Sequence, residues 1–157
     1  MAASGFSLVE LLVVLVIIGA AMGLLAGFTR SGLSGLHLRG SARDLVATLR
    51  YARERAVTQQ VTHKVVFSMQ DHKLYVADEL ERSRRPLQLN PDVRFRRIRI
   101  DGVDVRGRDL IGEIVFLPNG SSNPAEIVLE NSRGGKMKVV TDLLTGAAKT
   151  VPLGPGD

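Results

Sequence analysis

The sequence predicts an α+β protein in which a long N-terminal helix packs on an antiparallel β domain. Three observations lead to this fold class. Residues 6–28 are almost wholly apolar, apolar residues then recur at helical spacing to about Gln60, and from residue 61 onwards they alternate with polar ones. A helix repeats every 3.6 residues and a strand every 2, so the change of period marks the change of element.

The apolar run is long enough to cross a membrane. Its roughly 23 residues would extend about 35 Å as a helix, against about 30 Å for the hydrocarbon core of a bilayer. One charge interrupts it, the carboxylate of Glu10, which costs about 2.5–3.5 kcal/mol in a membrane helix. A cleaved secretory signal fits poorly, because residues 1–4 carry no basic side chain and the run is too long. A plain membrane anchor fits the length but leaves Glu10 unexplained.

The next segment, residues 30–60, is predicted to be an amphipathic helix. Its apolar residues are spaced by three or four positions, which aligns them on one face. The arginines of this segment fall on the other faces. Residues 31–35 and Gly40 are rich in glycine and serine, and they predict a looser connection between the apolar run and this helix. The residues of the apolar face are Leu38, Ala42, Leu45, Leu49, Ala52 and Ala56.

Residues 61–150 are predicted to form the antiparallel β domain. The first two strands form a hairpin, and a slip in the alternation at Arg96-Arg97 is typical of a β-bulge. Turns are expected at residues 118–120 and 133–135, and an irregular, flexible tail at residues 151–157. The expected strands are Lys64–Met69, Lys73–Ala77, Val93–Ile100, Glu113–Leu117, Glu126–Glu130 and Lys136–Thr141.

Composition and motifs exclude several classes of function. Cysteine is absent, which excludes disulfides, zinc–thiolate sites and a cysteine nucleophile. The three histidines lack a metal-ligand spacing, and neither a phosphate-binding loop nor a G-x-S-x-G elbow occurs. We therefore expect no enzyme activity, no catalytic residue, no metal or cofactor, and no small-molecule substrate.

The remaining signal is basic. The chain carries a net charge of +5, and Arg94, Arg96, Arg97 and Arg99 lie in one expected strand. Such a ladder could bind the phosphates of nucleic acid, meet acidic surfaces of neighbouring subunits, or remain solvated and protect a strand edge. Phe95 alone interleaves with these arginines, whereas single-strand binders stack bases on several rings. Nucleic acid is therefore the less favoured partner.

The residues Gly5-Phe6-Ser7-Leu8-Val9-Glu10-Leu11 resemble the processing motif of type IV prepilins and type II secretion pseudopilins. The resemblance implies a leader peptide at residues 1–5, cut by prepilin peptidase between Gly5 and Phe6, with N-methylation of Phe6. It also implies a transmembrane helix at residues 6–29, in which Glu10 meets the terminal amine of a neighbouring subunit for assembly. An amine and a carboxylate that meet in lipid offset each other's desolvation cost.

The C-terminal half, through residues 114–122, 127–129 and Thr145-Gly146, resembles the minor pseudopilin H group. The resemblance implies a pilin-like fold, whose helix has a membrane half and an amphipathic half. It implies a minor pseudopilin subunit of a type II secretion system, a structural component of the periplasmic pseudopilus used in protein export, with major and minor pseudopilins as partners. The alternative is a DNA-binding minor pilin of a type IV pilus or competence system, in which arginines are expected near the C-terminus. Here Lys149 is the basic residue after Thr145.

The family motif and the charge pattern disagree about orientation. The resemblance implies a single-pass protein of the bacterial inner membrane with its C-terminal domain in the periplasm. The leader has no lysine or arginine, whereas Arg30, Arg39 and Arg43 follow the apolar run, so the positive-inside rule favours a cytoplasmic domain. We follow the motif.

Three glycines recur every fourth residue within the apolar run: Gly19, Gly23 and Gly27. This spacing places them on one helix face, where another helix could approach closely. The competing interpretation is that glycine is simply more frequent in membrane helices.

Overall fold

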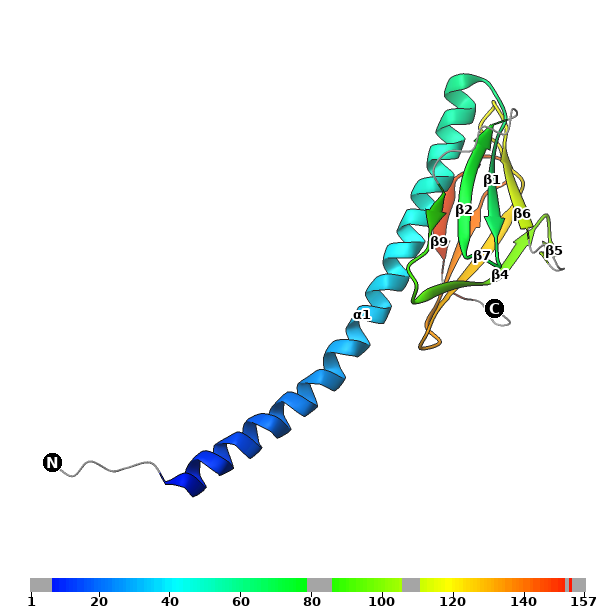
Figure 1. The fold of residues 1–157 in the computed structure, drawn as a ribbon. Coiled ribbons are helices and arrows are strands. Elements are labelled where there is room, and N and C mark those ends of the chain that lie inside the picture. Colours follow the sequence, from blue (N-terminus) through cyan, green and yellow to red (C-terminus); the bar gives the residue numbers. More distant parts are fainter. Residues whose placement is uncertain (1–6, 79–85, 106–110, 152, 154–157) are drawn as a thin grey trace. The chain divides into compact units, whose positions relative to one another are not determined.

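The computed structural model describes residues 7–78, 86–105, 111–151 and 153, and for residues 24–32 it describes only the backbone. The predicted leader, residues 1–5, lies outside the described residues. The chain divides into two units, Met1–Leu33 and Ser34–Asp157. Helix α1 (Leu8–Gln59) is continuous (Figure 1), and its first part belongs to the first unit while the rest belongs to the second.

Helix α1 corrects one prediction and confirms another. The looser connection expected at residues 31–35 and Gly40 is wrong, because α1 continues through these positions. Glycine costs a helix only about 0.5–1 kcal/mol relative to alanine, which a long packed helix tolerates. The predicted apolar face is confirmed, since its six residues, Leu38 to Ala56, are each at most 5% exposed. Beyond Gln59 the next residue, Gln60, adopts a left-handed φ of 54°, typical of a helix C-terminus.

Sheet A is antiparallel and contains four strands in the order β3-β2-β1-β6. The hairpin expected from the alternation is the β1–β2 pair, with Ser68 opposite Lys73. β3 was not predicted, because two residues are too short for a periodic pattern. The strands are β1 (His63–Ser68), β2 (Lys73–Asp78), β3 (Leu87–Gln88) and β6 (Ile111–Phe116).

Sheet B is also antiparallel and has the order β5-β4-β7-β8-β9. The predicted bulge is confirmed, since the register of β4 against β7 shifts between Phe95 and Arg97. The irregular tail is wrong at Val151, which pairs with Lys138 as the last residue of β9. The strands are β4 (Val93–Ile100), β5 (Val103–Asp104), β7 (Ala125–Asn131), β8 (Lys136–Thr141) and β9 (Ala148–Val151).

The hydrophobic core of the Ser34–Asp157 unit combines the buried face of α1 with the inner faces of both sheets (Figure 1). Phe67 of sheet A and Phe95 of sheet B meet edge to face, with 5.7 Å between ring centroids. The geometry is one that aromatic pairs prefer. Helix and sheets thus share one core, and the surfaces left for partners are the outer sheet faces, the exposed side of α1 and the sheet edges.

Candidate functional site

Glu10 lies in the first turn of α1. The backbone N–H groups of Glu10 and Leu11 donate to the Ser7 carbonyl oxygen at 3.0 and 3.2 Å. A carboxylate in a first helical turn is stabilised by the positive end of the helix dipole. The Glu10 side chain is exposed, so it is available to a group from outside the chain.

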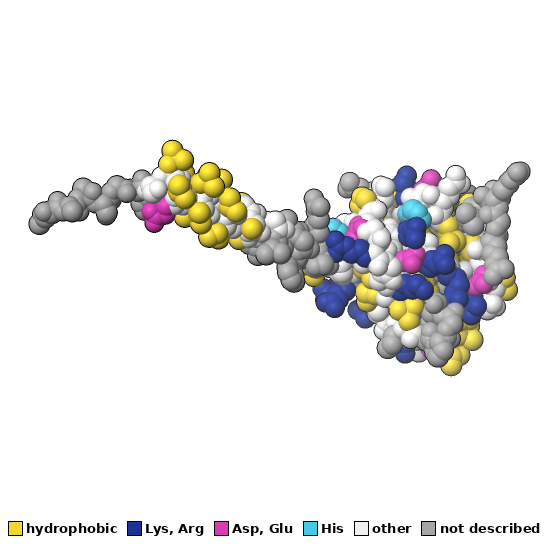
Figure 2. Space-filling model, turned by 90° about the horizontal axis from the view of Figure 1, so that it is seen from below, with side chains coloured by type: hydrophobic (Ala, Val, Ile, Leu, Met, Phe, Trp, Pro, Cys, Tyr) yellow, Lys and Arg dark blue, Asp and Glu magenta, His cyan; other side chains and the backbone are white. Residues whose placement is uncertain are grey.

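The described side chains that follow Glu10 are apolar on every side of the helix. The large side chains between Leu8 and Ile18 are 45–82% exposed, and Figure 2 shows hydrophobic atoms covering this part of the chain. Such a helix buries its apolar surface in another protein or in lipid. Nowhere in the described residues does a helix reach the length and apolar character that a membrane crossing requires.

The structure describes only some of the other residues that were predicted to act in this region. At Gly19 and Gly23 a Cβ atom would meet nothing within 4 Å, so both present open backbone surface. Gly27 lies where only the backbone is described, and the predicted cleavage site, Gly5 and Phe6, lies outside the described residues. The glycine packing face and the cleavage site stay predictions.

The predicted arginine ladder lies on the outer face of sheet B, where acidic residues of neighbouring strands match much of its charge. Arg94 donates to Glu130 at 2.9 Å from Nη2, and Arg99 donates to Asp104 at 3.1 Å from Nε. Arg96 is 3.9 Å from the same Glu130 carboxylate. Figure 2 shows basic side chains interspersed with acidic ones on the visible face of the Ser34–Asp157 unit. The basic contact surface of Arg94, Arg96, Arg97 and Arg99 stays a prediction.

Two turns and the helix meet at a junction that sequence reasoning missed. Arg53 of α1 donates from Nε to the Gly120 carbonyl oxygen at 3.1 Å. Gly146, in the β8–β9 turn with φ 59°, lies against the same carbonyl so closely that a Cβ atom would overlap it. Gly120 and Gly146 belong to the C-terminal motifs, but nothing in their spacing shows that they touch.

A second polar cluster centres on Asp92, which follows Pro91 before β4. Its carboxylate accepts hydrogen bonds from the hydroxyls of Ser34, at 2.6 Å, and Ser132. These bonds, with Ser132 the largest contributor, hold the pKa of Asp92 below its ordinary value of 3.8. The nearby His37 lies 3.6 Å away. Asp92 therefore joins the start of the second unit's helix to the β7–β8 turn.

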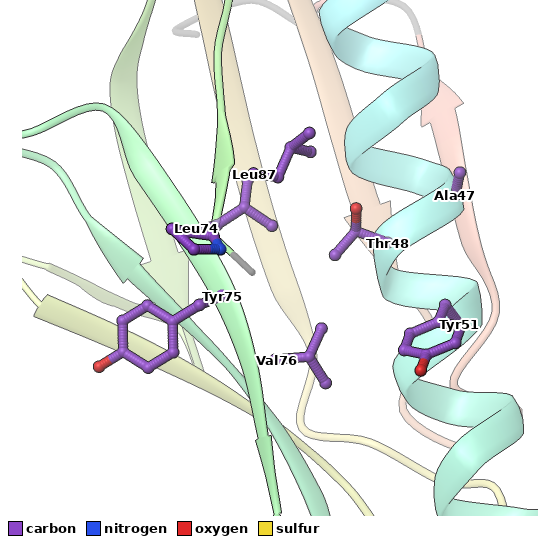
Figure 3. Close-up of a pocket in the computed structure, with 8 residues that line it drawn as sticks. Ala47, Thr48, Tyr51, Leu74, Tyr75, Val76 and Leu87 are labelled. Carbon is purple, nitrogen blue, oxygen red and sulfur yellow. The ribbon is translucent and has the colours of Figure 1, made fainter. Parts of the chain in front are cut away.

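Two shallow grooves flank the exposed side of α1 in the Ser34–Asp157 unit. The first, about 440 Å³, lies between α1 and strands β2 and β3; Figure 3 shows Thr48 and Tyr51 on the helix side, with Leu74 and Val76 on the strand side. The second, about 450 Å³, lies between α1 and β9. Among the described residues, no three histidine, aspartate or glutamate side chains are grouped as metal ligands.

Comparison with known protein families shows which class of protein has this geometry. The model of the family described as type II transport protein GspH matches residues 41–146, the part that forms the amphipathic helix and most of both sheets. The chain belongs to the GspH family. The prokaryotic N-terminal methylation motif matches residues 1–26, which include Glu10 and the predicted cleavage site.

Individual relatives of this GspH family member agree. The chain is 28% identical to type II secretion system protein H of Xanthomonas campestris over 149 residues, which are 95% of this chain and 83% of that protein. It is similar in fold to the minor pseudopilin EpsH of Vibrio cholerae, with a TM-score of 0.62 and 12% identity over 77% of this chain and 99% of that one. The type IV minor pilin FimU of Pseudomonas aeruginosa gives 0.53 and 16% over 73% and 93%.

The expected class of protein is confirmed. The chain is a minor pseudopilin of a type II secretion system with an α+β, pilin-like fold, and the alternative of a DNA-binding minor pilin is not favoured. The GspH family is a structural component of the pseudopilus, and its members interact with other pseudopilins.

Proposed function

We propose that this GspH family member is a non-catalytic building block, which prepilin peptidase processes and which joins the pseudopilus through its N-terminal helix. The observation that carries the proposal is the position of Glu10. It is exposed, in the first turn of α1, at the start of an otherwise apolar and exposed stretch. The N-terminal methylation motif over the same residues supports this reading.

The proposed cut between Gly5 and Phe6 would create a new amine close to this carboxylate. Phe6 would then be the N-methylated first residue, four positions before Glu10, or about 6 Å along a helix axis. In a filament the amine of one subunit would meet Glu10 of its neighbour. Each charge alone is costly in lipid, and pairing offsets that cost, so the contact favours one register of the two helices.

The proposed location is the bacterial inner membrane, with residues 6–29 as the transmembrane helix and the β domain in the periplasm. The apolar sequence from Phe6 to Phe28 and the methylation motif support the anchor. The partners would be major and minor pseudopilins along the filament, prepilin peptidase during maturation, and the membrane itself. The glycine face of Gly19, Gly23 and Gly27 would let a neighbouring helix approach closely.

Processing is tested by mass spectrometry of the N-terminus after expression with and without active prepilin peptidase. With the peptidase, we expect loss of Met1 to Gly5 and the gain of one methyl group on Phe6. The variant Gly5→Val should stay unprocessed, and Ala3→Val should be processed normally. An unmethylated chain that still begins at Met1 in the presence of active peptidase would refute the proposal.

Assembly is tested separately with Glu10→Gln, which removes the charge and keeps the shape. We expect normal membrane insertion but roughly hundredfold less crosslinking to other pseudopilins, because the neighbour's amine would be left unpaired in lipid. The matched control is Ser7→Ala, which should crosslink normally. If Glu10→Gln also crosslinks normally, the carboxylate does not set the register.

A further inference from the structure

The groove between α1 and β9 combines two features that suit the binding of an extended peptide, a pair of arginines and the edge of a sheet. It is lined by Arg43, Arg50 and Tyr51 of the helix and by Thr150 of β9, with Val46, Ala47 and Glu54 completing it. Its volume of about 450 Å³ lies in the range of ligand clefts. Arginines thus line one wall of the groove, and the other wall is a strand.

The groove arginines differ from those of sheet B in how their charge is matched. Neither Arg43 nor Arg50 has a hydrogen bond or ion pair with any side chain that the structure describes, and both are exposed. On sheet B, by contrast, Arg94 and Arg99 are paired with Glu130 and Asp104. The groove is therefore a surface on which two arginines, beside the one carboxylate of Glu54, leave positive charge for a partner.

β9 supplies the second feature, because it is the edge of sheet B. Its pairing with β8 occupies one side, and in the described part of the chain no backbone hydrogen bond is made on its other side. An edge strand presents N–H and C=O groups on which an extended peptide can add as a new strand. Ala148 is buried in the core and Thr150 lines the groove, so the inner face of β9 turns toward α1.

The two features coincide in space. A strand added to β9 would lie about 4.8 Å beyond it, over the groove and alongside Arg43 and Arg50. Alternate side chains of that strand would face the helix, where carboxylates would find both guanidinium groups. We infer that this groove binds an extended acidic segment of another protein subunit, by strand addition to β9 and carboxylate contacts to Arg43 and Arg50.

Nucleic acid is the competing partner for two unpaired arginines. The groove favours a polypeptide because a nucleic-acid backbone cannot pair with the free edge of β9. Stacking is also poorly provided for, since the Arg55 guanidinium already lies over the Tyr51 ring, 5.3 Å from the ring centroid.

The test uses the full chain in micelles of an uncharged detergent and a fluorescent peptide of alternating glutamate and threonine. We expect saturable binding that weakens with salt, together with slower hydrogen exchange of the β9 amides. The variant Arg43→Ala/Arg50→Ala should bind about tenfold or more weakly, because charge-assisted contacts are lost. Arg96→Ala/Arg133→Ala, with the same change of net charge, should bind as the unmodified chain does.

Four results would overturn the inference. The first two are that both double variants weaken binding of the acidic peptide equally, and that the peptide binds without slowing hydrogen exchange of the β9 amides. The other two are that a lysine–threonine peptide binds as tightly as the acidic one, and that duplex DNA, in place of the acidic peptide, binds in a way that depends on Arg43 and Arg50. The inference relies on the proposed function only for the source of the segment. Peptide binding and N-terminal processing are separate measurements, so either proposal can fail alone.

Discussion

Among the described glycines, Gly146 is the one where an added methyl group should do most harm to the β domain. Its φ of 59° is left-handed, which costs alanine about 1–2 kcal/mol. The added Cβ would also overlap the Gly120 carbonyl oxygen and come within 3.3 Å of Arg53 Cδ. Relief of the overlap would displace that carbonyl from the Arg53 guanidinium, a charged hydrogen bond worth about 1.5–3 kcal/mol. We expect Gly146→Ala to lower the free energy of unfolding by about 3–5 kcal/mol.

Intrinsic tyrosine fluorescence is a suitable assay. The chain has two tyrosines and no tryptophan, and both Tyr51 and Tyr75 belong to the Ser34–Asp157 unit. Urea unfolding of the full chain in micelles, followed by this signal, therefore reports on the β domain and its helix. Thermal unfolding should shift down by roughly 10 °C or more for a domain of this size.

Gly134→Ala is the matched control for Gly146→Ala. Gly134 has φ 79°, but a Cβ there would meet nothing within 4 Å. It should cost only the backbone strain, about 1–2 kcal/mol. If the two variants lose the same stability, the overlap with Gly120 contributes nothing and the reasoning about the junction is wrong.

Three further predictions concern other parts of the Ser34–Asp157 unit. Gly40→Ala should raise the free energy of unfolding by about 0.5–1 kcal/mol in the same urea assay, because the position is helical with open space around it; a loss of stability would contradict this. Asn123→Ala should lower it by about 1–3 kcal/mol, because the Asn123 Oδ1 accepts a hydrogen bond from the Val115 N–H of β6 at 2.8 Å; unchanged stability would contradict that contact. The pKa of Asp92 is lowered from its ordinary value of 3.8, first by the hydrogen bond from Ser132, so its carboxylate adds stability above that value and the added stability is lost as the pH falls through the folded pKa. Below pH 3.8 the melting temperature of Asp92→Asn should therefore fall less steeply with pH than that of the unmodified chain. Parallel profiles for the two proteins would refute this coupling.

Strand β4, which carries the arginine ladder, shows how much of a charged surface a sequence pattern can predict. Alternation correctly predicted a strand with a bulge near Arg96. It did not predict that Glu130 accepts from Arg94 at 2.9 Å and lies 3.9 Å from Arg96, because Glu130 comes from a strand far away in the sequence. Pairing across strands depends on register, and register is set by the core faces of both strands.

The N-terminal motif and the periodic elements could be predicted from the sequence alone. Glu10 in an apolar run, the buried helix face from Leu38 to Ala56 and the longer strands follow from local spacing and burial. Strands β3, β5 and β9 did not follow, because segments of two to four residues carry too little periodicity and become strands only when a neighbour pairs with them.

Of the proposed contact sites, one could be predicted from the sequence and the other could not. The first turn of α1 is a local feature, so the sequence by itself determined where Glu10, the proposed assembly carboxylate, would lie. The groove between α1 and β9 and the contact of Gly146 with Gly120 were decided only by tertiary structure. Each brings together residues separated by many positions, and their closeness results from how the helix and the sheets share one core.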